Sequence, residues 1–144
     1  MQTALPASSD VDALPQPYLL FLGDTVESGY AKTAFGLRDW ARERCVGEFA
    51  CDTARVTTGL PVLSPVQARQ AGARAMVIGV ANPGGRIPLV WIPLLVQALE
   101  AGLDLIGGMH MRLSGIEAVR NAARALGRQL IDVREPPANI PVAM

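Results

Sequence analysis

The chain has 144 residues, half of them apolar, and its 13 basic side chains balance 13 acidic ones. This length suits one domain with its own hydrophobic core. The charge balance argues against a nucleic-acid-binding protein, which normally carries a basic patch, and against a polybasic membrane anchor. The longest apolar run, residues 87–99, contains two prolines and is shorter than the roughly 20 residues that span a bilayer, so we expect no membrane partner.

The first 16 residues contain two aspartates, no basic residue and no apolar core segment. A signal peptide would have a basic start and a central apolar stretch. We therefore expect residues 1–16 to form a flexible leader and residues 17–142 to form the folded domain.

Five short apolar segments predict strands, in chain order at residues 18–22, 46–50, 75–80, 103–106 and 129–133. Such near-continuous apolar runs are typical of strands that are covered on both faces. Between them the apolar residues recur with a helical period, most clearly over residues 114–126. Strands that alternate with helices predict an α/β domain with a parallel sheet of about five strands in three layers. The pattern leaves the strand order open.

The predicted helices have recognisable ends. Ser64, followed by Pro65 and Gln67, indicates a capped helix start, and Ser114 with Glu117 indicates a second capping box. Glycines at positions 72, 102 and 127 indicate helix ends. Two further helices are expected, one over residues 31–44 and one that begins near residue 88 or 93.

Two cysteines, Cys45 and Cys51, flank the second predicted strand. Six extended residues place their Cα atoms roughly 20 Å apart, whereas a disulfide needs them within about 7 Å. Two thiols without a further ligand nearby also make a poor metal site. We therefore predict two reduced thiols, as in a cytoplasmic protein.

Unusual residues collect in three loops that follow predicted strands. Parallel strands send these loops to one edge of the sheet, where such folds bind ligands. The candidate ligand-binding residues are Gly23, Asp24, Lys32, Asn82, Gly84, Gly85 and Arg112. Lys32 and Arg112 can meet a phosphate or carboxylate, Arg112 in a bidentate manner. His110 is the chain's one histidine, and we assign it as the candidate catalytic base because imidazole titrates near neutral pH.

Each of these residues also has a structural interpretation. Residues 82–85 form a good turn sequence, Asp24 can cap a helix, and His110 can tie loops together by hydrogen bonds. The first loop lacks the G-x-G-x-x-G pattern of a dinucleotide site, and the chain has no P-loop, nucleophile elbow or metal-ligand cluster. The residues alone therefore give no complete catalytic constellation.

Several runs carry a resemblance to a known family: Leu22-Gly23-Asp24, Ala31-Lys32-Thr33-Ala34, Val77-Ile78-Gly79-Val80-Ala81-Asn82, Trp91-Ile92-Pro93 and Arg112-Leu113. Together they resemble the amino-terminal, Rossmann-like domain of the D-glutamate N-acetyltransferase family, long known only as a domain of unknown function. The resemblance covers roughly residues 17–142 and is most specific over residues 77–113. Residues 59–102 are also similar, more weakly, to the CoA-binding domain of succinyl-CoA synthetases.

The resemblance implies an acetyl-CoA-dependent N-acetyltransferase of D-amino-acid catabolism that has a further, carboxyl-terminal P-loop-like domain. That domain is absent from this chain, so we expect the chain alone to be inactive. Its expected partners are a small-molecule substrate and the P-loop-like domain, with a homo-oligomer left open. Two other functions stay open: a nucleotide-binding or oligomerisation module without chemistry, and an NAD-dependent oxidoreductase, which the missing glycine pattern disfavours.

Overall fold

The computed structural model describes residues 14–133. Its centre is a parallel sheet in the order β2-β1-β3-β4-β5. The strands are β1 (Tyr18–Phe21), β2 (Cys45–Phe49), β3 (Ala75–Ile78), β4 (Asp104–Gly107) and β5 (Leu130–Asp132). All five lie where the apolar runs predicted them, and the α/β class is confirmed. Most of the predicted leader, residues 1–13, and the predicted end of the domain, residues 134–142, fall outside the described residues.

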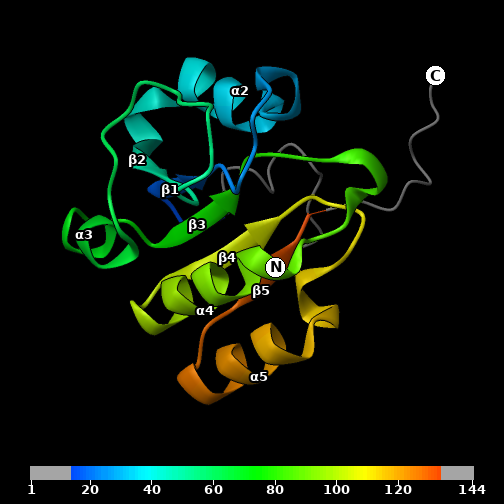
Figure 1. Ribbon diagram of the computed structural model, residues 1–144. Helices are drawn as coiled ribbons and strands as arrows, with labels where there is room; N and C mark the ends of the chain where they lie inside the picture. The colour runs from blue at the N-terminus through cyan, green and yellow to red at the C-terminus, as the bar shows by residue number, and fades with distance from the viewer. Residues whose placement is uncertain (1–13, 134–144) are drawn as a thin grey trace, which may run out of the picture.

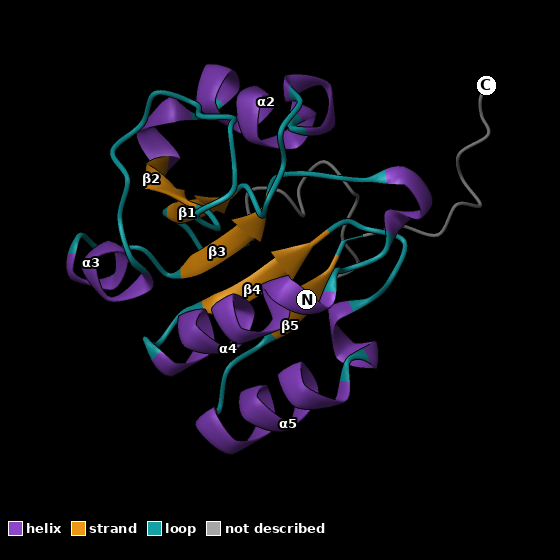
Figure 2. Cartoon of the chain, in the orientation of Figure 1, coloured by secondary structure: helices purple, strands orange, loops and turns teal. Residues whose placement is uncertain are grey.

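Helices cover both faces of the sheet (Figures 1 and 2). They are α2 (Lys32–Trp40), α3 (Pro65–Gln70), α4 (Ile92–Glu100) and α5 (Glu117–Leu126). The connection from β1 leads to β2 at one edge of the sheet. Every later connection leads in the opposite direction, from β2 past β1 to β3, then to β4 and to β5. Right-handed crossovers therefore place α2 on one face and the other three helices on the opposite face. Contacts of α4 with both α3 and α5 agree with this Rossmann-like, three-layer arrangement.

The central strands carry the core. Every residue of β1 and β3 is buried, as expected for strands covered on both faces. On one face α2 approaches closely, because a Cβ added to Gly79 would lie only 2.6 Å from the Cβ of Ala34. On the other face Trp91 and Leu95, at and just after the start of α4, are almost completely buried. The start of α2 and the start of α4 are thereby fixed against the same edge of the sheet.

The predicted helix ends are confirmed at α3 and are wrong at the start of α5. The hydroxyl of Ser64 accepts a hydrogen bond from the Gln67 N–H at 3.1 Å, and the Gln67 side chain accepts one from the Ser64 N–H at 2.9 Å. The Ser114 hydroxyl instead donates to Asp132 at 3.2 Å, and α5 begins three residues later. The helix predicted over residues 31–44 is also shorter, since α2 ends at Trp40 and a separate 3-10 turn follows.

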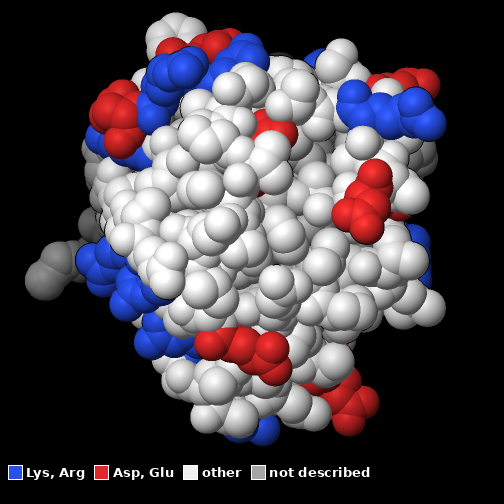
Figure 3. All heavy atoms as spheres, turned by 60° about the vertical axis from the view of Figure 1, so that its left-hand side comes forward, with Lys and Arg blue, Asp and Glu red and all other residues white. Residues whose placement is uncertain are grey.

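Within residues 14–133, no helix is long and apolar enough to cross a membrane. Basic and acidic side chains are interspersed around the margin of the face in Figure 3, and the middle of that face is uncharged.

Candidate functional site

The loops after β1 and β3 are joined by backbone hydrogen bonds at the carboxyl edge of the sheet. The Ala34 N–H donates to the Gly79 carbonyl at 2.9 Å, and the Ala81 N–H donates to the Tyr30 carbonyl at 2.7 Å. Lys32 lies between these two contacts, at the exposed start of α2. The structure therefore brings Lys32 beside the exit of β3.

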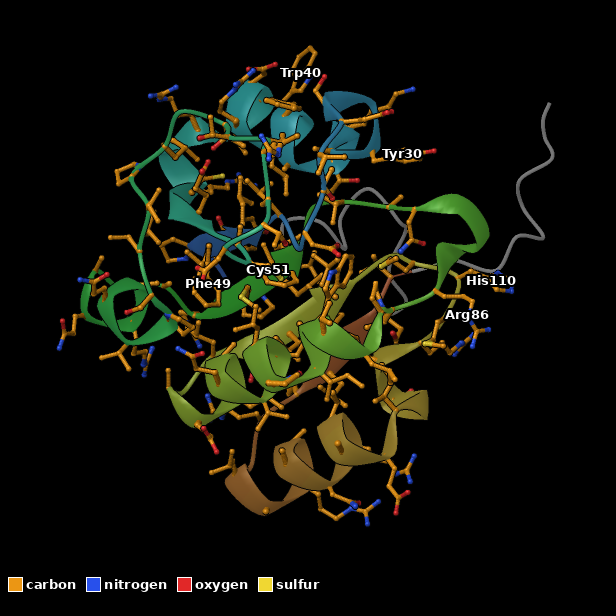
Figure 4. The ribbon with its side chains drawn as sticks, viewed as in Figure 1. Tyr30, Trp40, Phe49, Cys51, Arg86 and His110 are labelled. Atoms are coloured by element: carbon orange, nitrogen blue, oxygen red, sulfur yellow. The ribbon has the colours of Figure 1, made fainter. Side chains whose placement is uncertain are left out.

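The loops after β3 and β4 also meet, at Gly85 and His110. Gly85 has a φ of +64°, and a Cβ there would lie 2.5 Å from the Cβ of His110. The Met111 N–H donates to the Gly85 carbonyl at 2.8 Å. Only glycine permits this approach, because any side chain would collide with the next loop. Figure 4 shows His110 and Arg86 at the same end of the molecule, both pointing away from the sheet.

Asn82 shapes the turn in which it lies. Its side-chain N–H donates to the Arg86 carbonyl at 2.7 Å, and its side-chain oxygen accepts from the Arg86 N–H at 3.1 Å. The Gly85 N–H donates to the Asn82 carbonyl at 3.0 Å. The Asn82 amide is thus satisfied inside the loop and holds Arg86 in place, which is the structural role that its turn sequence allows.

A hollow of about 480 Å³ opens beside this turn, and we call it the Arg86 hollow. Its lining residues are Asn82, Arg86, Ile87, Pro88, Leu89, Ile92, Met111 and Ile116. Arg86 supplies its one charged side chain, which is exposed and bonds no other described residue. An arginine at the rim of an apolar hollow suits a ligand that has an anionic group and an apolar part.

Gly23 and Asp24 hold an indole ring in place. Gly23 has a φ of +60°, and a Cβ there would collide with the Trp91 ring. The Trp91 indole N–H donates to the Asp24 carboxylate at 2.9 Å, and the ring meets Phe21 edge to face at 5.4 Å. The close approach that Gly23 allows is therefore taken by a side chain of the same chain.

A second hollow, of about 530 Å³, opens on the other side of Trp91, and we call it the Asp52 hollow. Its lining residues are Asp24, Phe49, Ala50, Cys51, Asp52, Thr53, Val90, Pro93, Leu94 and Gln97. Its charged groups are both carboxylates, so its electrostatics are opposite to those of the Arg86 hollow. Leu89 lines one hollow and Val90 the other, so the 3-10 turn η4 (Leu89–Trp91) separates them.

A model of the DUF1611_N domain, a Rossmann-like domain of unknown function, matches residues 43–136. The chain belongs to this family. Two D-glutamate N-acetyltransferases are similar to it: one from Tritonibacter scottomollicae is 44% identical over 127 residues, and one from a Pseudoalteromonas species is 36% identical over 120 residues. These matches cover 88% and 83% of this chain but only 38% and 36% of the relatives.

The crystal structure of a DUF1611 family protein from Anabaena variabilis superposes with a TM-score of 0.62 at 30% identity. The superposition covers 90% of this chain and 40% of that protein. This DUF1611_N chain therefore spans about two-fifths of the length of the relatives that it matches.

The candidate residues of the DUF1611_N domain fall into two groups. Asn82, Gly84, Gly85 and His110 lie in the two loops that meet at Gly85. Gly23 and Asp24 do not lie with them but contact the Trp91 ring, and Asp24 lines the Asp52 hollow. The exposed Arg112 directly precedes the 3-10 turn η5 (Leu113–Gly115), and the side chains of His110 and Arg112 make no hydrogen bond with a described residue.

Sequence reasoning did not select Arg86 or Asp132. Arg86 follows the glycine pair of the third-strand loop, and that position is the signal that could have identified it. Asp132 ends β5 and accepts hydrogen bonds from the Leu113 N–H at 2.7 Å and the Ser114 N–H at 3.4 Å. It thereby fixes the loop that carries His110 and Arg112.

Both cysteines are free, as predicted from their spacing. Burial raises the pKa of the Cys51 thiol, and the carboxylates of Asp24 and Asp52 raise it further. Burial, followed by the Glu43 carboxylate, raises the pKa of Cys45. A raised pKa lowers the reactive thiolate fraction at pH 7.

We therefore expect both native thiols to react with iodoacetamide more slowly than an exposed model thiol at pH 7. The rate should keep rising at pH values above the ordinary thiol pKa, because both pKa values are raised. A Cys45→Ala variant isolates the rate of Cys51. In denatured, unreduced protein, two thiols per chain should react with a thiol reagent. Fewer than two would contradict the absence of a disulfide.

Proposed function

We propose that this chain is the amino-terminal ligand-binding domain of an acetyl-CoA-dependent D-glutamate N-acetyltransferase that acts in cytoplasmic D-amino-acid catabolism. The observation that carries the proposal is the 44% identity over 127 residues to a protein named for that activity. Because this chain spans only 38% of that relative, the proposal includes a further domain that completes the enzyme.

The reaction requires a neutral amine and a well-placed thioester. The amino nitrogen of D-glutamate forms a bond to the acetyl carbon, the carbon–sulfur bond of acetyl-CoA breaks, and the CoA sulfur leaves with the electron pair and takes up the second proton that the nitrogen gives up. The substrate ammonium must lose a proton first, and we assign this proton to the exposed imidazole of His110. The His110 side chain is exposed, and its loop is held in place by the loop that carries Gly85. A substrate can therefore reach this imidazole.

Both substrates carry anionic groups, the carboxylates of D-glutamate and the phosphates of CoA. Lys32, Arg86 and Arg112 are exposed cations in or beside the three carboxyl-edge loops, and none bonds another described side chain. Arginine can bind a carboxylate or phosphate with two hydrogen bonds. The Arg86 hollow adds an apolar wall beside such a cation, so it suits the anionic end of a substrate whose remainder is apolar.

A chimera tests the proposed function. The 127 matched residues of the Tritonibacter scottomollicae relative are replaced by the corresponding part of this chain. We expect the chimera to convert D-glutamate and acetyl-CoA into N-acetyl-D-glutamate, measured by mass spectrometry and by the release of the CoA thiol. The 144-residue chain alone should give no turnover, because none of the described residues forms a complete nucleophile or acid–base pair.

L-Glutamate serves as the substrate control, and circular dichroism verifies that the chimera is folded. A folded chimera that acetylates neither enantiomer would contradict the proposed function. Turnover by the 144-residue chain alone would contradict the requirement for a further domain.

A further inference from the structure

Two large apolar side chains stand exposed between the two hollows. Leu89 is 81% exposed and Val90 is 60% exposed. They belong to residues 88–92, which join the loop after β3 to α4 and which we call the η4 ridge. They continue into the apolar lining of the two hollows, and a contiguous exposed apolar surface is what marks a protein contact site.

The η4 ridge is held firmly from below. Trp91 is 1% exposed, packs against Gly23 and donates its indole N–H to Asp24. Two exposed apolar side chains therefore stand on a buried aromatic anchor. Such a preorganised surface loses little conformational entropy when a partner binds it.

We propose that the η4 ridge is the surface against which the carboxyl-terminal part of the transferase docks, beside both hollows. This inference rests on the proposed function. The relatives supply the occupant, since about three-fifths of their length lies outside the match. The path of the chain agrees, because β5 ends at the same edge of the sheet as the η4 ridge and the Val133 N–H bonds the Gly107 carbonyl at 2.8 Å.

The charges beside the η4 ridge define the surface that fits it. The partner presents an apolar recess for Leu89 and Val90. Beside that recess the partner must leave Arg86 accessible to an anion. It must also place no uncompensated carboxylate against Asp24 and Asp52, because two buried like charges repel strongly. A second copy of this chain would offer the same apolar pair and the same carboxylates.

Hydrogen–deuterium exchange locates the docking surface without relying on activity. The amides of residues 86–92 are compared between the 144-residue chain and the chimera described above. We expect exchange in the chimera to be slower by about tenfold or more, because docking must open before these amides exchange. The amides of α3 serve as the internal control, since Arg69 of α3 lies beside Gly102 at the opposite edge of the sheet.

Substitution tests the apolar contact itself. Replacing Leu89→Asp and Val90→Asp together in the chimera should abolish the protection and lower transferase turnover by about tenfold or more. Val66→Asp is the matched control, because Val66 is 52% exposed on α3, and it should change neither readout. In the 144-residue chain the double variant should keep its melting temperature, since both side chains are exposed.

The outcomes separate this inference from the proposed function. An active chimera whose residues 86–92 exchange as fast as in the isolated chain would overturn the docking surface and leave the function standing. Protection in a chimera that does not acetylate D-glutamate would support the docking surface and overturn the function. Dimerisation of the 144-residue chain that Leu89→Asp abolishes would overturn the proposal in favour of a self-interface. If the first chimera does not fold, the same exchange comparison is made on the Anabaena variabilis framework.

Discussion

Trp91→Ala is expected to lower the free energy of unfolding of the 144-residue chain by about 3–5 kcal/mol, the cost of removing a large aromatic side chain from a packed core. Trp91 is 1% exposed and ties the start of α4 to the end of β1 through its contacts with Phe21, Gly23 and Asp24. Its loss leaves a cavity under the η4 ridge and an unpaired Asp24 carboxylate. Urea denaturation followed by circular dichroism gives the free energy directly.

The second tryptophan of the chain provides the control. Trp40 ends α2 and is 88% exposed, so Trp40→Ala should change stability by no more than about 0.5 kcal/mol. Trp91→Phe keeps most of the ring but removes the indole N–H, and it should cost about 1–2 kcal/mol through the lost hydrogen bond. Equal effects of the two alanine substitutions would show that Trp91 is not the anchor of this edge.

The elements of this fold are predictable because they depend on local patterns. The strands are short apolar runs, and α3 begins at a capping box and a proline that lie within four residues. The strand order depends on which strands pair, and the sequence does not show this. All residues of β1 and of β3 are buried, so the apolar pattern does not tell which of these strands takes which place in the sheet. The pairing is therefore decided by the crossovers and by packing across the sheet.

The candidate site was predictable as a set of loops, but the contacts within it were not. Parallel topology alone places the residues after β1, β3 and β4 at one edge. The contact of Trp91 with Asp24 joins residues 67 positions apart, and the contact of Ser114 with Asp132 joins residues 18 positions apart. Asp24 was predicted to contact a ligand and Ser114 to cap a helix. Each instead forms a hydrogen bond with a residue that is distant in the sequence.

His110→Ala in the chimera is expected to reduce turnover by about a hundredfold, the typical loss when a general base is removed. The turnover that remains should rise with pH, because the ammonium group of D-glutamate must then lose its proton to the solvent. The folded state should be unaffected, within about 0.5 kcal/mol, because the side chain is exposed and makes no hydrogen bond with a described residue. Steady-state kinetics across a pH series and thermal unfolding measure the two effects separately.

His110→Gln distinguishes catalysis from loop positioning. Glutamine fills similar space and can hydrogen-bond, but it cannot take the proton of the substrate ammonium, so we expect a loss close to that of alanine. Added imidazole should restore part of the turnover of His110→Ala, because an exposed position beside Gly85 leaves room for a free base to enter. If glutamine keeps full turnover, or if alanine loses nothing, proton transfer must be assigned to another group. A loss confined to KM, with kcat unchanged, would instead assign His110 to substrate binding.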